Sequence, residues 1–335
     1  MLMVVTGSSG GHILPAKAVL EKWISQEESC IWVGRKDSLE AETATQIGAT
    51  FATCTPVNIR QLHIRRPIQA IRSLISWYKE INQLFEEHQP KAVFLTGSYI
   101  TLMPAIVAKK RGVKIIVHEQ NQVKGFANQF IQKFADQLLS AYPLKGYKLV
   151  GNPVSIGGVY TSDRIKKLLV LGGSQGSQFL NESLPKILNA NESIEVIHVC
   201  GKDCEKLMKA YQSANIRATV ISFSHQMSDL YTWADLVVCR AGAMTLAEVA
   251  AYGLPAVTVP LPSASRNHQV HNATYYEQQG AVVVVKQCID ELSHALRELM
   301  HTPAKCKALS KQVVTLHRSD AAEKIIECIK RMSRD

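Results

Sequence analysis

The residues with the clearest chemical potential lie between Arg240 and Asn272, in the segment RAGAMTLAEVAAYGLPAVTVPLPSASRNHQVHN. A glycine turn leads there into a short alanine-rich stretch that favours a helix and carries Glu248. The first amides of a helix have no partner inside it and attract a phosphate. A carboxylate one turn further on suits the vicinal hydroxyls of a ribose. This spacing predicts a sugar-nucleotide pocket.

The same segment continues into a Pro-bounded apolar strand, VTVP, and a polar loop that ends in Asn267, His268 and Gln269. Ligands of open α/β sheets bind outside the carboxyl ends of the strands. We therefore expect one edge of a parallel sheet to carry the helix start, the carboxylate of Glu248 and the polar loop. The phosphate would meet the amides of Ala243, Met244 and Thr245.

The elements that must position these residues occur twice along the chain. Residues 1–20 and 167–184 each run from an apolar strand through a Gly-rich turn into a helix, and further short apolar strands alternate with helix-length segments. This pattern predicts an α/β protein with two Rossmann-like, doubly wound domains. The expected domains are 1–156 and 157–319, divided near the Gly- and Pro-rich stretch 150–158, with a last helix at about 320–335 packing back on the first domain.

Both Gly-rich turns are candidate phosphate loops, because glycine lets the backbone approach a ligand closely at a helix start. Neither is a strict GxGxxG, and neither ends in the GK[ST] of a P-loop, so tight turns without a ligand remain an alternative for each. The glycines are Gly7, Gly10 and Gly11 in the first turn and Gly172, Gly173 and Gly176 in the second.

A nicotinamide-dependent oxidoreductase is a second hypothesis. Such an enzyme places an acidic residue after its second strand to hold the ribose. The second strand here, CIWV, is followed by Gly34, Arg35 and Lys36, which would suit only a cofactor with a 2′-phosphate. An NADP-linked enzyme therefore stays open as the alternative.

Composition narrows the class of protein. The chain has 335 residues, 46% of them apolar, with no run long enough to span a bilayer and no signal-peptide pattern at Met1. The net charge of +10 favours anionic partners, and without zinc-finger spacing or nucleic-acid motifs these are expected to be phosphates or a membrane. The eight cysteines are expected to be free thiols, with Cys200 and Cys204 merely neighbours in a turn.

Seven motifs in order resemble the bacterial GT-B family that transfers N-acetylglucosamine from UDP-N-acetylglucosamine to lipid I, giving lipid II of peptidoglycan. The likeness spans essentially the whole chain. The motifs are GSSGGHILPA near the start, GSYITLMP at 97–104, HEQN at 118–121, GNPV at 151–154, GGSQGS at 172–177, CRAGAMTLAE at 239–248 and NHQ at 267–269.

This resemblance implies roles for individual residues. Ser174 would touch the nucleotide, Glu248 the ribose and Gln269 the transferred sugar, while the backbone at Ser224 would contact the uracil. The pyrophosphate would lie at Ala243, Met244, Thr245, Leu246 and Ala247. From the first domain, Ser9, Gly10, Gly11 and Asn121 would complete the donor site, and His12 takes the position of the general base.

The chain departs from the family pattern at several positions. Ser8 stands where the family has glycine, and Ser98 replaces the second glycine of the GGYxS loop, in which Thr101 replaces the serine. Ser155 replaces an arginine that follows GNPV and contacts the nucleotide sugar. Arg266 replaces a commonly acidic residue before NHQ.

Inverting transfer needs a base for the attacking hydroxyl and preorganised donors for the departing phosphate. His12 can accept a proton near neutral pH, although a histidine after two glycines also suits a capping or packing role, and Glu119 is a weaker candidate. The chain has no Asp-x-Asp motif, so neither a metal nor another cofactor is expected.

The polyprenyl-linked acceptor implied by the resemblance would bring the protein to the cytoplasmic face of the inner membrane, with other cell-wall synthesis proteins as further partners. Residues 65–85 predict an amphipathic helix whose Ile68, Arg72, Ile75 and Lys79 would contact an anionic bilayer. A core-packed helix with a solvated basic edge is the alternative. A catalytically silent scaffold of the same fold is the third functional hypothesis.

Overall fold

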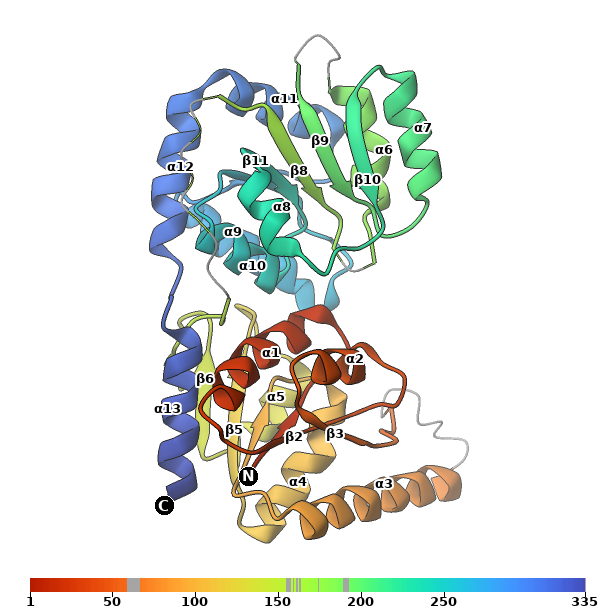
Figure 1. The fold of residues 1–335 in the computed structure, drawn as a ribbon, viewed down its shortest axis with the longest axis vertical. Coiled ribbons are helices and arrows are strands. Elements are labelled where there is room, and N and C mark those ends of the chain that lie inside the picture. Colours follow the sequence, from red (N-terminus) through yellow and green to blue (C-terminus); the bar gives the residue numbers. More distant parts are fainter. Residues whose placement is uncertain are drawn as a thin grey trace. The chain divides into compact units, whose positions relative to one another are not determined.

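The computed structural model describes residues 1–58, 67–154, 158, 160, 162, 164–173, 175–188 and 193–334. The chain divides into two compact units. Unit 1 comprises Met1–Val154 and Asp320–Asp335, and unit 2 comprises Ser155–Ser319. Each unit is described by itself below, with the element labels of Figure 1.

Unit 1 is built on a seven-stranded sheet in the order β3-β2-β1-β4-β5-β6-β7. Every neighbouring pair in this sheet is parallel. The central strands are fully buried, as expected for a parallel sheet with helices on both faces. The strands are β1 Leu2–Val5, β2 Cys30–Gly34, β3 Thr50–Thr53, β4 Ala92–Leu95, β5 Lys114–Glu119, β6 Gln137–Ser140 and β7 Lys148–Leu149.

Alternate residues of these strands feed two separate hydrophobic cores, because successive strand side chains point to opposite faces of the sheet. Leu2, Val4 and Phe94 pack under α1 and α13, whereas Met3 and Val5 pack under α3, α4 and α5. The helices are α1 Gly10–Ile24, α2 Leu39–Gln46, α3 Pro67–His88, α4 Leu102–Arg111, α5 Phe126–Ile131 and α13 Ala321–Arg334, with a short 3-10 turn η2 at Tyr99–Thr101.

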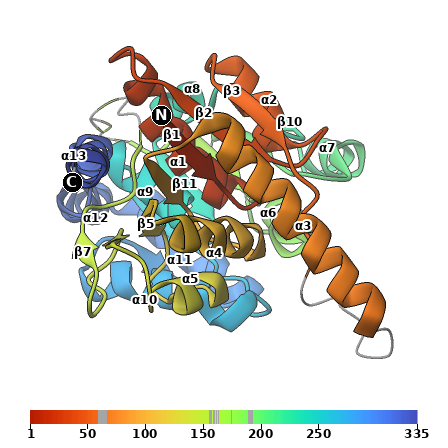
Figure 2. The ribbon, with the colours of Figure 1, turned by 90° about the horizontal axis from the view of Figure 1, so that it is seen from below.

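The last helix of the chain belongs to the first unit. Ile325, Ile326 and Ile329 of α13 are buried in the same core as α1, and Lys22 of α1 pairs with Glu323. In Figures 1 and 2, α13 runs beside the sheet of unit 1. The chain therefore leaves unit 1 after Val154 and returns to it at Asp320.

Unit 2 repeats the architecture with a six-stranded parallel sheet in the order β10-β9-β8-β11-β12-β13. Its strands are β8 Lys167–Leu171, β9 Glu195–Val199, β10 Arg217–Ile221, β11 Leu236–Cys239, β12 Ala256–Thr258 and β13 Val283–Val284. Its helices are α6 Gln178–Ile187, α7 Cys204–Ser213, α8 Met227–Trp233, α9 Ala243–Ala251, α10 His268–Gln278, α11 Ile289–His301 and α12 Pro303–Thr315, with the 3-10 turn η4 at Ser265–Asn267.

The strand order reverses once in each sheet. In unit 1 this happens between β1 and β4, and in unit 2 between β8 and β11. Loops diverge at such a point and leave a crevice at the carboxyl edge, where open α/β sheets bind ligands. The loops that follow these four strands carry Gly7, Gly97, Gly172 and Gly242.

The predicted fold class of two Rossmann-like domains is confirmed by these two parallel sheets. None of the helices within the described residues is long and apolar enough to cross a membrane.

Candidate active site

The loop after β11 turns directly into α9. Gly242 is the N-cap, with extended backbone angles of φ −65° and ψ 142°, and it carries no side chain to cap the helix. The amides of the first turn therefore face outward from a helix whose dipole places positive charge there. Thr245 is partly exposed, whereas Ala243, Met244, Leu246 and Ala247 are buried. Such a helix start is suited to a diphosphate.

Glu248 lies one turn further along α9 and is partly exposed. Its Oε2 accepts a hydrogen bond of 2.7 Å from the hydroxyl of Tyr231, on α8. Burial of the carboxyl group raises its pKa to about 7, and the hydrogen bond from Tyr231 opposes that rise. The structure thus places a carboxylate, poised between its charged and neutral forms, within two turns of a helix start that is suited to a phosphate.

Gln269 follows a turn built from unusual backbone. Arg266 and Asn267 both adopt left-handed conformations, with φ of 56° and 54°, immediately before α10 begins. The Oε1 of Gln269 accepts a hydrogen bond of 2.9 Å from the amide of Leu261, in the loop after β12. This bond fixes the orientation of the side-chain amide and leaves its NH₂ group as the donor for a ligand.

Arg240 donates hydrogen bonds to the loop after β12, a role that the sequence did not predict. Its side chain is 7% exposed. The guanidinium donates to the carbonyls of Val259 and Pro260 at 3.0 and 3.4 Å and to Oε1 of Gln287 at 3.2 Å. Arg240 therefore ties the start of α9 to the turn that precedes Leu261. An arginine two positions before the glycine that starts a helix is the sequence signal that could have identified it.

The Gly-rich loop after β8 is tightly packed against the end of β9. A Cβ atom on Gly172 would lie 2.7 Å from the amide nitrogen of Ser177, and one on Gly176 would overlap the carbonyl oxygen of Cys200. Only glycine fits at these two positions, so the close turn is required by packing. Ser174 and Ser155, both singled out in the sequence, lie outside the described residues.

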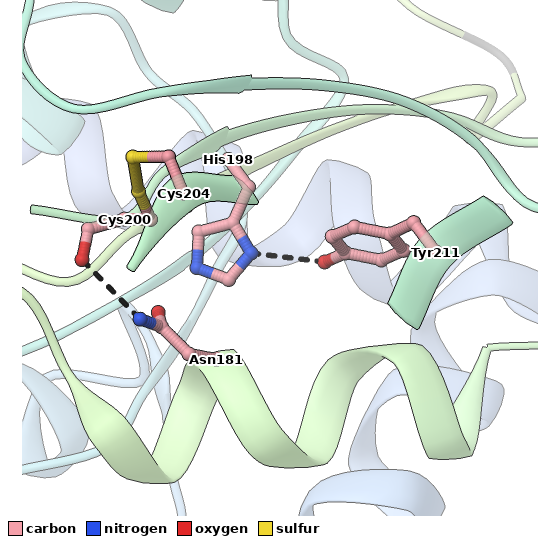
Figure 3. Close-up of a disulfide and its surroundings, with 5 residues drawn as sticks. All are labelled: Asn181, His198, Cys200, Cys204 and Tyr211. Carbon is pink, nitrogen blue, oxygen red and sulfur yellow. Dashed lines mark hydrogen bonds between the residues drawn. A yellow bond between two sulfur atoms is a disulfide. The ribbon is translucent and has the colours of Figure 1, made fainter. Parts of the chain in front are cut away.

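Cys200 and Cys204 form a disulfide at the end of β9, shown in Figure 3. The prediction of free thiols is therefore wrong for this pair. Their Cα atoms are 6.1 Å apart, within the range that a disulfide can span. The left-handed Asp203, which precedes α7, brings Cys204 back toward the strand end. The other six cysteines are unpaired, as predicted, and all of them except Cys288 are buried.

Figure 3 also shows the polar groups beside this disulfide. Asn181 of α6 donates to the carbonyl of Cys200 at 3.3 Å, and the hydroxyl of Tyr211 lies 2.9 Å from Nδ1 of His198. Burial lowers the pKa of His198 to about 3, so that its imidazole is neutral. These contacts stabilise the end of β9, against which the Gly-rich loop after β8 packs.

Ser224 lies in the loop after β10 and is partly exposed. Its hydroxyl accepts a hydrogen bond of 3.1 Å from the amide of Gln226. The neighbouring Phe223 is 53% exposed and packs edge-on against His225. A solvent-facing aromatic ring is suited to a planar base, since nucleobases stack on aromatic side chains.

In unit 1, His12 is held between two glycines. A Cβ atom on Gly7 would lie 2.6 Å from Cδ2 of the imidazole, and one on Gly97 would lie 3.2 Å from its Cε1. Nδ1 of His12 is 2.7 Å from the carbonyl oxygen of Thr96. A carbonyl can only accept, so Nδ1 carries the hydrogen and the neutral ring has its lone pair on Nε2. The structure thus gives His12 the tautomer that a base needs.

A buried histidine, His118, lies behind the partly exposed His12. His118 is fully buried, and burial lowers its pKa to about 4, so the ring is neutral. Its Nε2 donates to the carbonyl of Gly151 at 2.9 Å. Gln120 donates to the carbonyl of His118, and its Oε1 lies 3.1 Å from Nδ1 of His12. His118 and Gln120 therefore act as supports behind the His12 ring.

Glu119 is engaged by four donors. Its Oε1 accepts from the amide and side chain of Asn121 at 3.1 and 3.3 Å, and its Oε2 accepts from the amide of Gly125 and the side chain of Asn128, each at 2.8 Å. The residue is 1% exposed. A carboxylate so fully used holds its loop in shape, and this arrangement argues against Glu119 as the base.

The remaining predicted residues of unit 1 lie at the start of α1. Ser9 is the N-cap, with an extended backbone and a side chain that does not bond to the helix amides, and it is exposed. Gly10 and Gly11 form the first turn, and no acidic residue lies in that turn. Within the described residues, no group of three or more His, Cys, Asp or Glu side chains could hold a metal ion.

Two models of known families match this chain. The Glycosyltransferase family 28 N-terminal domain matches residues 2–140, and the Glycosyltransferase family 28 C-terminal domain matches residues 167–325. The chain is also similar, along almost all of its length, to proteins named UDP-N-acetylglucosamine–N-acetylmuramyl-(pentapeptide) pyrophosphoryl-undecaprenol N-acetylglucosamine transferase. The one from Pseudomonas syringae pv. syringae is 31% identical over 97% of this chain and 96% of its own length. The one from Stutzerimonas stutzeri is 33% identical over 97% of both.

The chain belongs to glycosyltransferase family 28, in the group formed by these N-acetylglucosamine transferases. Among solved structures it is similar to Acinetobacter baumannii MurG, with a TM-score of 0.82 and 25% identity over 98% of this chain and 99% of that one. A UDP-GlcNAc 2-epimerase from Neisseria meningitidis shares the fold, with a TM-score of 0.69 at 10% identity over 98% of this chain and 99% of that one. The two-domain fold of this glycosyltransferase is thus the one expected from its motifs.

Proposed function

We propose that this glycosyltransferase moves N-acetylglucosamine from UDP-N-acetylglucosamine to the C4 hydroxyl of the N-acetylmuramyl unit of lipid I, with inversion at C1. The full-length similarity to transferases named for this donor and acceptor supports the reaction. The observation that carries it at the site is the sequence of groups along α9. A helix start suited to a diphosphate is followed, within two turns, by a carboxylate suited to a ribose. Nothing in the described residues favours the oxidoreductase or the silent scaffold.

Unit 2 supplies the donor contacts in this proposal. The diphosphate lies at the start of α9, beside the segment from Ala243 to Ala247, where the helix dipole stabilises the negative charge that develops as UDP leaves. Glu248 accepts hydrogen bonds from the ribose, and the NH₂ group of Gln269 donates to the transferred sugar. Ser224 and Ser174 complete the nucleotide contacts. Further contacts to the donor are proposed for residues of unit 1, namely Ser9, Gly10, Gly11 and Asn121.

His12 is the proposed general base. Its Nε2 takes the proton from the C4 hydroxyl as that oxygen attacks C1 of the sugar, and the bond from Nδ1 to the carbonyl of Thr96 stabilises the imidazolium that results. Glu119 is assigned to positioning, because its four hydrogen bonds hold the 119–128 loop.

Turnover of a lipid I analogue with labelled UDP-N-acetylglucosamine tests the reaction. His12→Ala is expected to lower kcat by about 10²–10⁴-fold, with the KM for the donor changed only a few-fold, because a positioned base contributes about that much to the rate. A His12→Ala variant with turnover within a few-fold of wild type would remove His12 from this role. Stabilisation of the fold by NADPH, and not by UDP-N-acetylglucosamine, would instead favour the oxidoreductase.

We also propose that α3 brings the protein to an anionic membrane surface. The helix has a buried face and an exposed face. On the buried face, Trp77, Ile81 and Phe85 are at most 2% exposed and pack into the core, which agrees with the core-packed alternative for this face. Ile68 and Ile75 are 68% and 49% exposed.

The exposed face of α3 carries both the apolar and the basic side chains that a membrane contact needs. Ile71, which the sequence analysis did not include, is 56% exposed between Ile68 and Ile75. Arg72 and Lys79 are exposed as well. In Figure 2 the first turns of α3 extend outward from the rest of unit 1. Apolar side chains flanked by basic ones suit an interface with anionic lipid.

Co-sedimentation with vesicles that contain phosphatidylglycerol tests this contact. Replacing Arg72, Ile75 and Lys79 with serine should weaken binding at least about tenfold, since each basic residue near such a surface contributes about 1 kcal/mol. The matched control replaces the exposed Lys206 and Lys209 of α7 and should bind as wild type. Equal loss in both variants would mean that net charge alone, and not α3, governs binding.

A further inference from the structure

Tyr231 reaches Glu248 from a different element of unit 2. Tyr231 lies on α8, and its hydroxyl donates to Oε2 of Glu248 on α9 at 2.7 Å. Among the described residues, Tyr231 is the only side chain that donates a hydrogen bond to this carboxylate. One carboxylate oxygen is therefore fixed by the protein, and Oε1 is left for a ligand.

The phenol ring itself cannot move away from Glu248. Tyr231 is 1% exposed, and its ring stacks on that of Tyr252, with the ring centroids 5.2 Å apart and the planes 24° from parallel. Tyr252 is the C-cap of α9 and is 5% exposed. The stack thus joins α8 to the end of the helix that carries Glu248. A buried hydroxyl held in this way needs its hydrogen-bond partner, and the carboxylate supplies it.

We propose that Tyr231 is a positioning residue for the donor, which aims Oε1 of Glu248 at the vicinal hydroxyls of the ribose. The proposal rests on the function proposed above and extends it to a residue that does not itself touch the substrate. A carboxylate with one oxygen fixed presents the other in a single direction. It therefore favours donors with intact ribose hydroxyls over those that lack one.

The groups around Glu248 make this hydrogen bond important for its charge as well. Its titratable neighbours are Tyr231, Tyr252 and the buried thiol of Cys239, with Asp229 acting on Tyr252 from α8. None of them is a cation. Burial favours the protonated carboxyl group, and the bond from Tyr231 opposes it. Loss of that bond should move the pKa of Glu248 further upward, so that less of the carboxylate is charged at neutral pH.

The test is Tyr231→Phe, which removes one oxygen atom and keeps the ring stack. The KM for UDP-N-acetylglucosamine at pH 7 should rise about tenfold, as for the loss of one hydrogen bond to a charged group, with kcat within about twofold. The acidic limb of the pH profile of kcat/KM for the donor should move to higher pH. With a 2′-deoxyribose donor the difference in KM between variant and wild type should shrink, because one of the two hydroxyls that Glu248 accepts from is gone.

Tyr211→Phe is the matched control. It too removes a buried hydroxyl from unit 2, but that hydroxyl lies beside His198 and not beside Glu248. Its donor KM and pH limb should match wild type, whatever its effect on melting. An unchanged KM and limb in Tyr231→Phe would overturn the proposal, as would an equal shift in Tyr211→Phe.

Stability and function are separated by two further measurements. Should Tyr231→Phe melt too early to assay, the wild-type protein is compared with ribose and 2′-deoxyribose donors at pH 6 and pH 9. Under the proposal the penalty for the missing hydroxyl is large at pH 9 and small at pH 6, and an equal penalty at both pH values refutes it. A wild-type protein that transfers no sugar refutes the proposed function itself, whereas a donor KM in Tyr231→Phe equal to that of an active wild-type protein refutes only the role of Tyr231.

Discussion

Ser98 is expected to be a strained residue whose replacement by glycine stabilises the protein. Its backbone has φ 74° and ψ 161°, a region that essentially only glycine occupies. The strain of a side chain there costs about 1–3 kcal/mol. Glycine would remove that strain but cost about 0.5–1 kcal/mol in backbone entropy. The balance is a gain of about 1 kcal/mol for Ser98→Gly.

Calorimetric melting measures this gain in unit 1. A gain of about 1 kcal/mol should raise the Tm of a unit of this size by about 2–4 °C. Ser98→Ala is the control, because it removes the hydroxyl but keeps the Cβ atom that causes the strain. Its Tm should not rise. The strain argument is refuted if Ser98→Gly melts at or below the wild-type temperature, or if Ser98→Ala gains as much.

Three further predictions concern the supports of the site. Gly7→Ala should lower kcat about 10²-fold or more in the transfer assay, because its Cβ would lie 2.6 Å from Cδ2 of His12 and displace the base; normal turnover would show that the ring position does not matter. Arg240→Met should destabilise unit 2 by about 2–3 kcal/mol in urea unfolding, since it leaves buried carbonyl groups unpaired, and a loss below 0.5 kcal/mol would contradict this. Cys204→Ser should lower the free energy of unfolding by about 2 kcal/mol without reductant, because the variant cannot close the short loop between Cys200 and Cys204. With dithiothreitol the difference should almost vanish, since the disulfide is then reduced in the wild-type protein as well. An equal loss under both conditions would assign the effect to packing.

Strands with an uninterrupted apolar run could be predicted from the sequence. The predicted strand CIWV lies within β2, Cys30–Gly34, because an uninterrupted apolar run is typical of a strand buried on both faces. The sequence did not predict β3 or β6. Their sequences, TFAT and QLLS, are short and half polar, and both strands lie outside the centre of the sheet. Short, half-polar sequences of this kind give no apolar pattern from which a strand can be predicted.

The sequence predicted candidate site residues from local spacing, and it missed the residues that support them from a distance. Glu248 was recognised because it follows a helix start in the same segment. Tyr231 and Arg240 act through contacts made by the fold. Tyr231 lies 17 positions from Glu248, and Arg240 bonds to Gln287, 47 positions away. No spacing rule connects such pairs.

The same limit explains the differing outcomes for His12 and Glu119. The family resemblance made His12 a candidate base, and Glu119 was the weaker candidate. Their partners distinguish them. Nδ1 of His12 faces a carbonyl oxygen that leaves Nε2 able to accept a proton, whereas every oxygen of Glu119 already accepts hydrogen bonds within its own loop. The choice of base therefore depends on which lone pairs the fold leaves unused, and that is a property of the assembled site.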